Sequence, residues 1–272
     1  MLTTENFRSY QHKLADKYYG SPGCTLPKEL MLIDQAVIDY LSGRGSNRTT
    51  THIMWIKGPL NEDILSGFSQ ATKIVVLSKQ TTLEPLKVLH KLERLYCESM
   101  LTLGNLLGLE HLTGLKVLDI SDNRISSLTE LQHLTNLEVL DFSFNQVEDA
   151  SVISGLKKLR KLSCTHNKIT KLDLNCPNLR TLSCYSNRLE ELPTFPPGSL
   201  LKGIAFSNNR ISDLKPLANC QLLKAVNGHH NNIRELTGIE GCELLQQLDL
   251  EDNQLISTEL VRGLKGLRNF RY

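Results

Sequence analysis

The sequence lacks a continuous apolar run near the ~20 residues that a membrane-spanning helix requires. Its start, Met1 to Asp16, is polar and mixed in charge, without the apolar stretch of a secretory signal. An excess of one charge is also missing, because 31 Lys and Arg oppose 29 Asp and Glu and leave a net charge of +2. Proteins that neutralise many phosphates usually carry a basic excess. These absences predict a cytoplasmic or nuclear protein that contacts neither membrane nor nucleic acid.

The motifs of common catalytic sites are missing as well. The chain has no phosphate-binding G-x-x-x-x-G-K-[ST] loop, no zinc-binding H-E-x-x-H and no G-x-S-x-G nucleophile turn. Histidines and carboxylates occur, but no arrangement of them suggests a nucleophile beside a base. We therefore expect no enzymatic activity and no cofactor.

What the sequence does contain is a repeat, Leu-x-x-Leu-x-Leu-x-x-Asn-x-Ile, which is cleanest at Leu115, Leu118, Ile120, Asn123 and Ile125. Seven in-register copies carry Asn123, Asn145, Asn167, Asn187, Asn209, Asn231 and Asn253. The asparagines are 22 residues apart, with one spacing of 20. Unrelated amphipathic segments would not keep an asparagine in phase, so the period predicts a solenoid of stacked repeats.

Each part of the repeat has a structural reading. Alternating apolar residues such as Leu118 and Ile120 predict a short strand with one buried face, stacked in parallel on the next. The turn after each strand leaves buried backbone groups, and asparagine can both donate to them and accept from them. The seven asparagines are therefore predicted to form a buried structural ladder. Apolar residues three apart, as at Leu128, Leu131 and Leu134, predict a 3-10 or irregular return segment.

The segments Leu115–Leu137 and Leu137–Leu159 resemble the 22-residue leucine-rich repeat class typified by a regulatory subunit of protein phosphatase 1. The resemblance covers roughly residues 71–272. It implies an α/β leucine-rich-repeat solenoid, a curved right-handed superhelix with parallel strands on the concave face and a 3-10 or irregular convex side. Members of this class bind phosphatases, tubulin-linked or axonemal proteins, and spliceosomal proteins through the concave face.

The domain organisation follows from where the repeat fades. Residues 1–50 read as an N-terminal helical cap, 51–114 as degenerate repeats and 115–272 as regular repeats. Weak strands are expected at 73–77 and at 51–57, the latter with Ile53 and Trp55 inward, which gives eleven strands when Phe270 is counted. After the last repeat, residues 263–272 form the cap, the sheet edge pairs with a second copy, or the chain is truncated. A monomer and an edge-paired dimer are both compatible with this pattern.

Cysteines and histidines have structural readings. Six of the seven cysteines stand where other repeats carry core leucine or isoleucine, which predicts reduced core thiols and no metal site. His229 and His230 adjoin on an expected strand, near His166. Neighbours on a strand point to opposite faces, so only one of the pair could join His166, and no carboxylate is in phase with them. We expect histidines of a binding surface without metal.

The concave face follows from the register. It should present the residue between the second and third apolar positions and the two residues before each asparagine, which have no core role. We predict a partner-binding surface made of Tyr96, Asp119, Asp122, Asp141, Phe144, His166, Tyr185, Asn208, His229, His230, Asp249, Glu251 and Asp252. Its acidic ends favour a partner with a basic face, and its central aromatics are typical of binding hot spots.

The sequence thus predicts a non-catalytic module that holds a folded protein on its concave face. The resemblance makes a Ser/Thr phosphatase catalytic subunit the first candidate partner. An alternative is a cytoskeletal or axonemal scaffold that uses the convex face or the N-terminal helices. An RNA-processing adaptor is a third class, although the balanced charge argues against direct RNA contact.

Overall fold

The computed structural model describes residues 54–56, 60–76 and 79–272. The helical cap predicted for residues 1–50 lies outside the described residues. Within them, no helix has the length and apolar character to cross a membrane.

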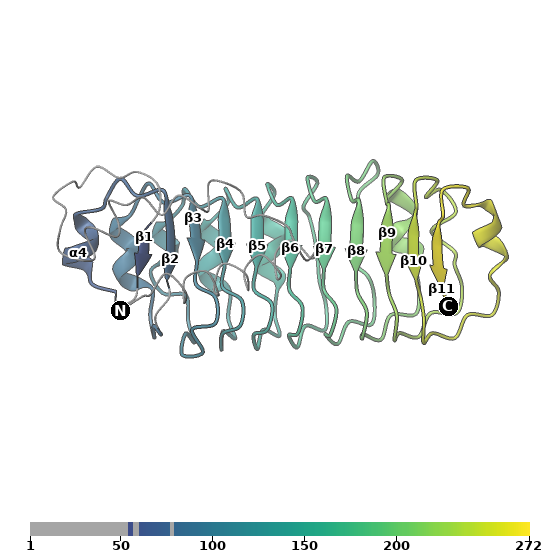
Figure 1. The fold of residues 1–272 in the computed structure, drawn as a ribbon, viewed down its shortest axis with the longest axis horizontal. Helices are drawn as coiled ribbons and strands as arrows, with labels where there is room; N and C mark the ends of the chain where they lie inside the picture. The colour runs from purple at the N-terminus through teal and green to yellow at the C-terminus, as the bar shows by residue number, and fades with distance from the viewer. Residues whose placement is uncertain (1–53, 57–59, 77–78) are drawn as a thin grey trace, which may run out of the picture.

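The fold is a single parallel sheet of eleven short strands that follow one another in chain order. Figure 1 shows them side by side along the long axis of the molecule, from β1 in purple to β11 in yellow. The strands are β1 (Met54–Ile56), β2 (Lys73–Val76), β3 (Arg94–Tyr96), β4 (Val117–Asp119), β5 (Val139–Asp141), β6 (Lys161–Ser163), β7 (Thr181–Ser183), β8 (Gly203–Ala205), β9 (Ala225–Asn227), β10 (Gln247–Asp249) and β11 (Asn269–Arg271). The eleven strands agree with the number that the repeat phase predicts.

The return segments between strands are short and varied. They contain α4 (Glu62–Ser66) and the 3-10 helices η1 (Glu84–Val88), η2 (Leu109–His111), η3 (Thr129–His133), η4 (Ser151–Gly155), η5 (Lys215–Asn219) and η6 (Glu259–Gly263). The apolar spacing of three matches the hydrogen bonding, because the N–H of Leu131 donates to Leu128 and that of Leu134 to Leu131, both at 2.9 Å. The segments between β6 and β7, β7 and β8, and β9 and β10 contain no helix.

The core runs the length of the stack between the sheet and the return segments. In-phase residues pack against their counterparts one repeat away, as Leu118 pairs with Leu140 and Leu140 with Leu162, all fully buried. Each repeat covers only its neighbours, so the core is continuous and quasi-one-dimensional.

The cysteines among the described residues are free and buried within this core: Cys97, Cys164, Cys176, Cys184, Cys220 and Cys242. Burial disfavours the charged thiolate and raises the pKa of Cys184 to about 12 and that of Cys176 to about 11. These thiols therefore stay neutral at physiological pH and act as small apolar side chains.

The register of the first strand differs from the sequence prediction. Met54 is aligned with Ile74, and Trp55 with Val75, so the alignment that placed Ile53 and Trp55 inward is wrong by one residue. Further along, an extra residue separates the strand of Leu95 from that of Leu118, where the spacing is 23 instead of 22. The backbone absorbs it at Leu101, which has a left-handed φ of 57°.

Candidate protein-binding face

The asparagine ladder fixes the backbone at the end of every strand. The Asn145 amide nitrogen donates to the carbonyls of Ile120 and Phe142, both at 2.9 Å, and of Ser143 at 3.2 Å. Its oxygen accepts from the N–H of Ile125 at 2.9 Å, in the preceding repeat. Each asparagine thus joins two repeats and satisfies buried backbone groups that would otherwise lack partners.

The other ladder asparagines repeat this geometry with some differences in burial. Each side-chain nitrogen contacts carbonyls of its own repeat and of the preceding one. Asn123, Asn145, Asn167 and Asn231 are buried as predicted, whereas Asn187, Asn209 and Asn253 are half-buried. The oxygen of Asn123 has no hydrogen-bond partner among the described residues, because the repeat before it is irregular around Leu101.

The residue before each ladder asparagine adopts a left-handed backbone, with φ between 51° and 56°. These residues are Asp122, Phe144, His166, Ser186, Asn208, His230 and Asp252. The conformation turns the N–H toward the next repeat, as in the 2.8 Å bond from Phe144 to the carbonyl of Thr165. Asn, Asp and His tolerate this region best, and a bulky residue there is an outlier. Phe144 is the bulky exception, and it is 44% exposed.

We expect Phe144→Asn to stabilise the protein by about 0.5 kcal/mol. Relief of the left-handed backbone strain at residue 144 stabilises the folded state by about 1–2 kcal/mol. Loss of the stacking contact between Phe144 and His166 offsets part of that gain. Urea unfolding of the single variant, and of the same change made in a His166→Ala background, measures both contributions. The gain should rise to about 1 kcal/mol or more when His166 is absent. A loss of stability in both backgrounds would show that Phe144 has a structural role.

Three aromatic side chains from successive repeats meet just past the C-terminal ends of β5, β6 and β7, at the edge of the sheet that carries the ladder. We call them the aromatic cluster: Phe144, His166 and Tyr185. Phe144 stacks on His166 with ring centroids 4.1 Å apart and planes at 11°. His166 contacts Tyr185 edge to face at 5.2 Å. Phe144 and His166 are exposed and Tyr185 is half-buried, so the cluster offers a preformed apolar surface to solvent.

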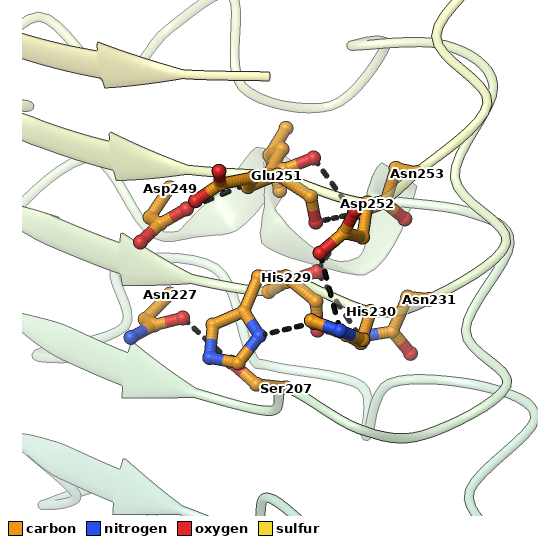
Figure 2. Close-up of polar contacts among 11 residues, drawn as sticks. Ser207, Asn227, His229, His230, Asn231, Asp249, Glu251, Asp252 and Asn253 are labelled. Carbon is orange, nitrogen blue, oxygen red and sulfur yellow. Dashed lines mark hydrogen bonds and ion pairs between the residues drawn. The ribbon is translucent and has the colours of Figure 1, made fainter.

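The histidine pair lies farther along the same edge (Figure 2). The Nδ1 atoms of His229 and His230 are 2.8 Å apart, and His230 Nε2 lies 3.1 Å from the Asp252 carboxylate. Three sequence expectations are therefore wrong. The two histidines turn toward each other, because β9 ends at Asn227 and His230 has a left-handed φ of 54°. His166 packs in the aromatic cluster instead of with them, and a carboxylate does lie beside them.

The histidine pair and its neighbours do not form a cluster of metal-ligand type. Within the described ranges there is no group of three or more His, Cys, Asp or Glu side chains that could hold an ion.

The predicted acidic ends differ from each other. Asp119 is buried, with 3% of its surface exposed, so its prediction as a surface contact is wrong. Its carboxylate turns back and accepts from the Ser121 N–H at 3.0 Å and hydroxyl at 2.7 Å. Asp122 accepts from the Ser99 hydroxyl at 2.6 Å and is half-buried. At the other end Glu251 and Asp252 are exposed, which leaves the accessible negative charge at the C-terminal end.

The remaining predicted residues line the same face. Asp141 is half-buried and accepts from the Ser143 N–H at 2.9 Å, while Asn208 is exposed. Tyr96 is half-buried under the Lys73 ammonium, 5.5 Å from its ring centre. Asp249 is half-buried and lies 3.9 Å from Arg271.

The comparison with protein families bears on this geometry. Residues 113–155 and 157–197 match the family described as Leucine Rich repeats (2 copies). These segments are leucine-rich repeats. The matched residues carry β4 to β7 and the first four ladder asparagines, so the stacked strands and the ladder belong to this repeat architecture. The comparison with curated proteins gave no significant match.

Solved structures resemble a large part of the chain. The internalin inlF from Listeria monocytogenes is 24% identical with a TM-score of 0.75, and the match covers 82% of this chain and 67% of that one. The InlJ functional domain from Listeria monocytogenes, described as including a cysteine ladder, is 28% identical with a TM-score of 0.53, and the match covers 68% of this chain but 45% of that one. The structure of the TLR13–ssRNA13 complex is 24% identical with a TM-score of 0.62, and the match covers 79% of this chain and 35% of that one. At these identities the likeness to inlF and TLR13 shows the fold alone.

Sequence reasoning missed part of the face. A second residue of each strand shares the side of the predicted one and lies two residues before it, because side chains alternate with period two. Lys161, Thr181 and Gly203 occupy this position, and the alternation itself could have identified them. Over β7 to β11 the outward residues line a hollow of about 660 Å³. The small side chains of Ala205 and Ala225 leave this space open.

Proposed function

We propose that the protein is a non-catalytic interaction module that holds a folded protein partner on the outer face of its sheet. The observation that carries this proposal is the aromatic cluster at the strand ends. Phe144 is kept exposed in a backbone conformation that disfavours its side chain, and strain of this kind concentrates at functional positions. Rigid exposed aromatics supply large contact area at small entropic cost, which is the character of binding hot spots.

The rest of the face supports the same function. Stacked repeats hold the side chains on a rigid scaffold, and solenoids use such extended surfaces to bind partners. The exposed carboxylates of Glu251 and Asp252 lie beyond the aromatic cluster and would speed the approach of a partner with a basic surface. We place the protein in the cytoplasm or nucleus, and the first partner to test is a Ser/Thr protein phosphatase catalytic subunit.

We expect the Phe144→Ala/Tyr185→Ala double variant to bind its partner about a thousandfold more weakly, because truncated hot-spot residues each cost about 2 kcal/mol. The partner is first captured from cell extract and identified by mass spectrometry, with purified phosphatase catalytic subunit tested in parallel. Titration calorimetry then measures the Kd.

The matched control is Leu107→Ala/Leu244→Ala, which removes apolar side chains of similar exposure, 50% and 46%, from outside the strands. The control should bind as the unmodified chain does. If the aromatic double variant binds normally and the control does not, the partner uses the return segments, as the scaffold alternative requires. Circular dichroism of all variants checks that the fold is retained.

A further inference from the structure

A row of polar residues crosses the molecule at the edge where the strands begin. The row consists of the residue after the first leucine of each repeat, and backbone hydrogen bonds join its members directly. The N–H of Arg180 donates to the carbonyl of Arg160, that of Lys202 to Arg180, and that of Lys224 to Lys202, each at 2.8 Å. Consecutive members are therefore neighbours in space, about 4.8 Å apart in the backbone.

The two halves of the row differ in their pattern of charge. In its first half the sign alternates and the charges pair, with Lys116 Nζ 2.7 Å from the Glu93 carboxylate and Arg160 Nη1 3.3 Å from that of Glu138. Its second half is Arg180, Lys202, Lys224, Gln246 and Arg268, and we call its three consecutive cations, Arg180, Lys202 and Lys224, the basic row. All three side chains are exposed, and none forms an ion pair with any residue that the structure describes. Adjacent like charges repel, so an anion bound along the basic row would relieve that repulsion.

The basic row borders the hollow described above. Its three members directly precede Thr181, Gly203 and Ala225, which line that space. Over β7 to β9 the lining includes the small residues Ser183, Ala205 and Ala225. Apart from Gly203 and its chain neighbours, no atom lies within 4 Å of the position that a Cβ would take on Gly203. A partner segment can therefore bring its backbone close to the sheet and still reach the cations at the edge.

We propose that the basic row and the hollow together bind an acidic, Asp- or Glu-rich segment of a protein partner. The segment lies in the hollow with its carboxylates on Arg180, Lys202 and Lys224. Asp249 also lines the hollow, but it lies 3.9 Å from Arg271, and Arg268 and Arg271 add positive charge to the lining. Because the proposed function makes the partner a protein, we assign the anionic segment to a peptide, and nucleic acid is an outcome of the test. This inference rests on the proposed function in using the same face, but it needs none of the aromatic cluster.

The test measures binding of a fluorescent oligoglutamate peptide to the full chain by anisotropy, at low and at raised salt. We expect Arg180→Gln/Lys202→Gln/Lys224→Gln to bind about tenfold more weakly, because three exposed charge pairs are lost. The control, Arg124→Gln/Arg188→Gln/Arg210→Gln, changes the net charge by the same amount through exposed residues that follow the ladder positions, and should change binding less than twofold. Gly203→Trp places a bulky ring in the hollow without changing charge and should also weaken binding.

Three outcomes would overturn the proposal. Equal losses in the two triple variants would mean non-specific attraction to net charge. Unchanged binding by Gly203→Trp would exclude the hollow. Tighter binding of a single-stranded oligonucleotide of equal charge would assign the row to nucleic acid.

The Phe144→Ala/Tyr185→Ala variant separates this proposal from the proposed function. It should bind the peptide normally while it loses the folded partner. If it keeps the folded partner and the basic-row variant loses the peptide, the proposed function of the aromatic cluster fails and the acidic-segment site stands.

Discussion

Replacing Asn145 by alanine is expected to lower the free energy of unfolding by about 3–4 kcal/mol. The side chain makes three hydrogen bonds to carbonyls and one to the N–H of Ile125, and it is 91% buried, with 9% of its surface exposed. Alanine leaves these backbone groups buried without partners, and each such group costs about 1–3 kcal/mol. Part of that cost is recovered where water enters the space that the amide leaves.

Asn136→Ala is the matched control. The half-buried Asn136 side chain also donates to a backbone carbonyl, that of Thr113 at 2.9 Å, but this bond is exposed to solvent, so water can replace it. Its loss should cost less than about 0.5 kcal/mol. Urea denaturation followed by circular dichroism measures both variants. Equal losses would mean that the ladder asparagines stabilise the fold no more than surface residues do.

The sequence predicts the ladder because its determinants are local and periodic. An asparagine that follows each strand in phase can donate to and accept from buried backbone groups of the turn. In the structure Asn145 does both, because it donates to the Phe142 carbonyl and accepts from the Ile125 N–H. The same holds for the buried cysteines, whose positions coincide with those of core leucines. Spacing alone gives these results, since every repeat meets an almost identical environment.

Other features depend on strand register and backbone conformation, which the spacing of the repeat does not determine. Ile53, Met54, Trp55 and Ile56 are all apolar, so no alternation of polarity fixes the register of β1, and the prediction missed it by one residue. The ring positions of His166 and His230 depend on a left-handed φ just past the strand, which redirects both side chains. A strand rule for side-chain direction does not apply there.

The candidate face was predicted in outline for a related reason. The repeat register places its residues on successive repeats, and in the structure Phe144, His166 and Tyr185 lie in contact. The burial of Asp119 and the hollow over β7 to β11 arise from side chains that fold back or are small in several repeats at once. Such collective features appear only when the repeats are stacked.

Packing between repeats gives the second large expected effect, at Gly228. This glycine stands at the third apolar position, where Leu250 and Cys184 stand in other repeats. A Cβ there would lie 2.4 Å from two ring atoms of Phe206, whose fully buried ring fills the space of the missing side chain. We expect Gly228→Leu to lower the free energy of unfolding by about 2–3 kcal/mol through overpacking. Phe206→Ala should cost about 3–5 kcal/mol through the cavity that it leaves.

The two changes together should compensate, because leucine at position 228 occupies the space that the ring of Phe206 vacates. A double-mutant cycle by urea unfolding should give a coupling of about 2 kcal/mol in favour of the double variant. Gly203→Ala, at a glycine with open space around it, is the control and should stay within about 0.5 kcal/mol. If the two changes in unfolding free energy were strictly additive, the core packing of each repeat would be independent of its neighbour. Coupling would instead show that the core is complementary between neighbouring repeats, so that one repeat's departure from the leucine pattern is explained only by the residue one repeat away.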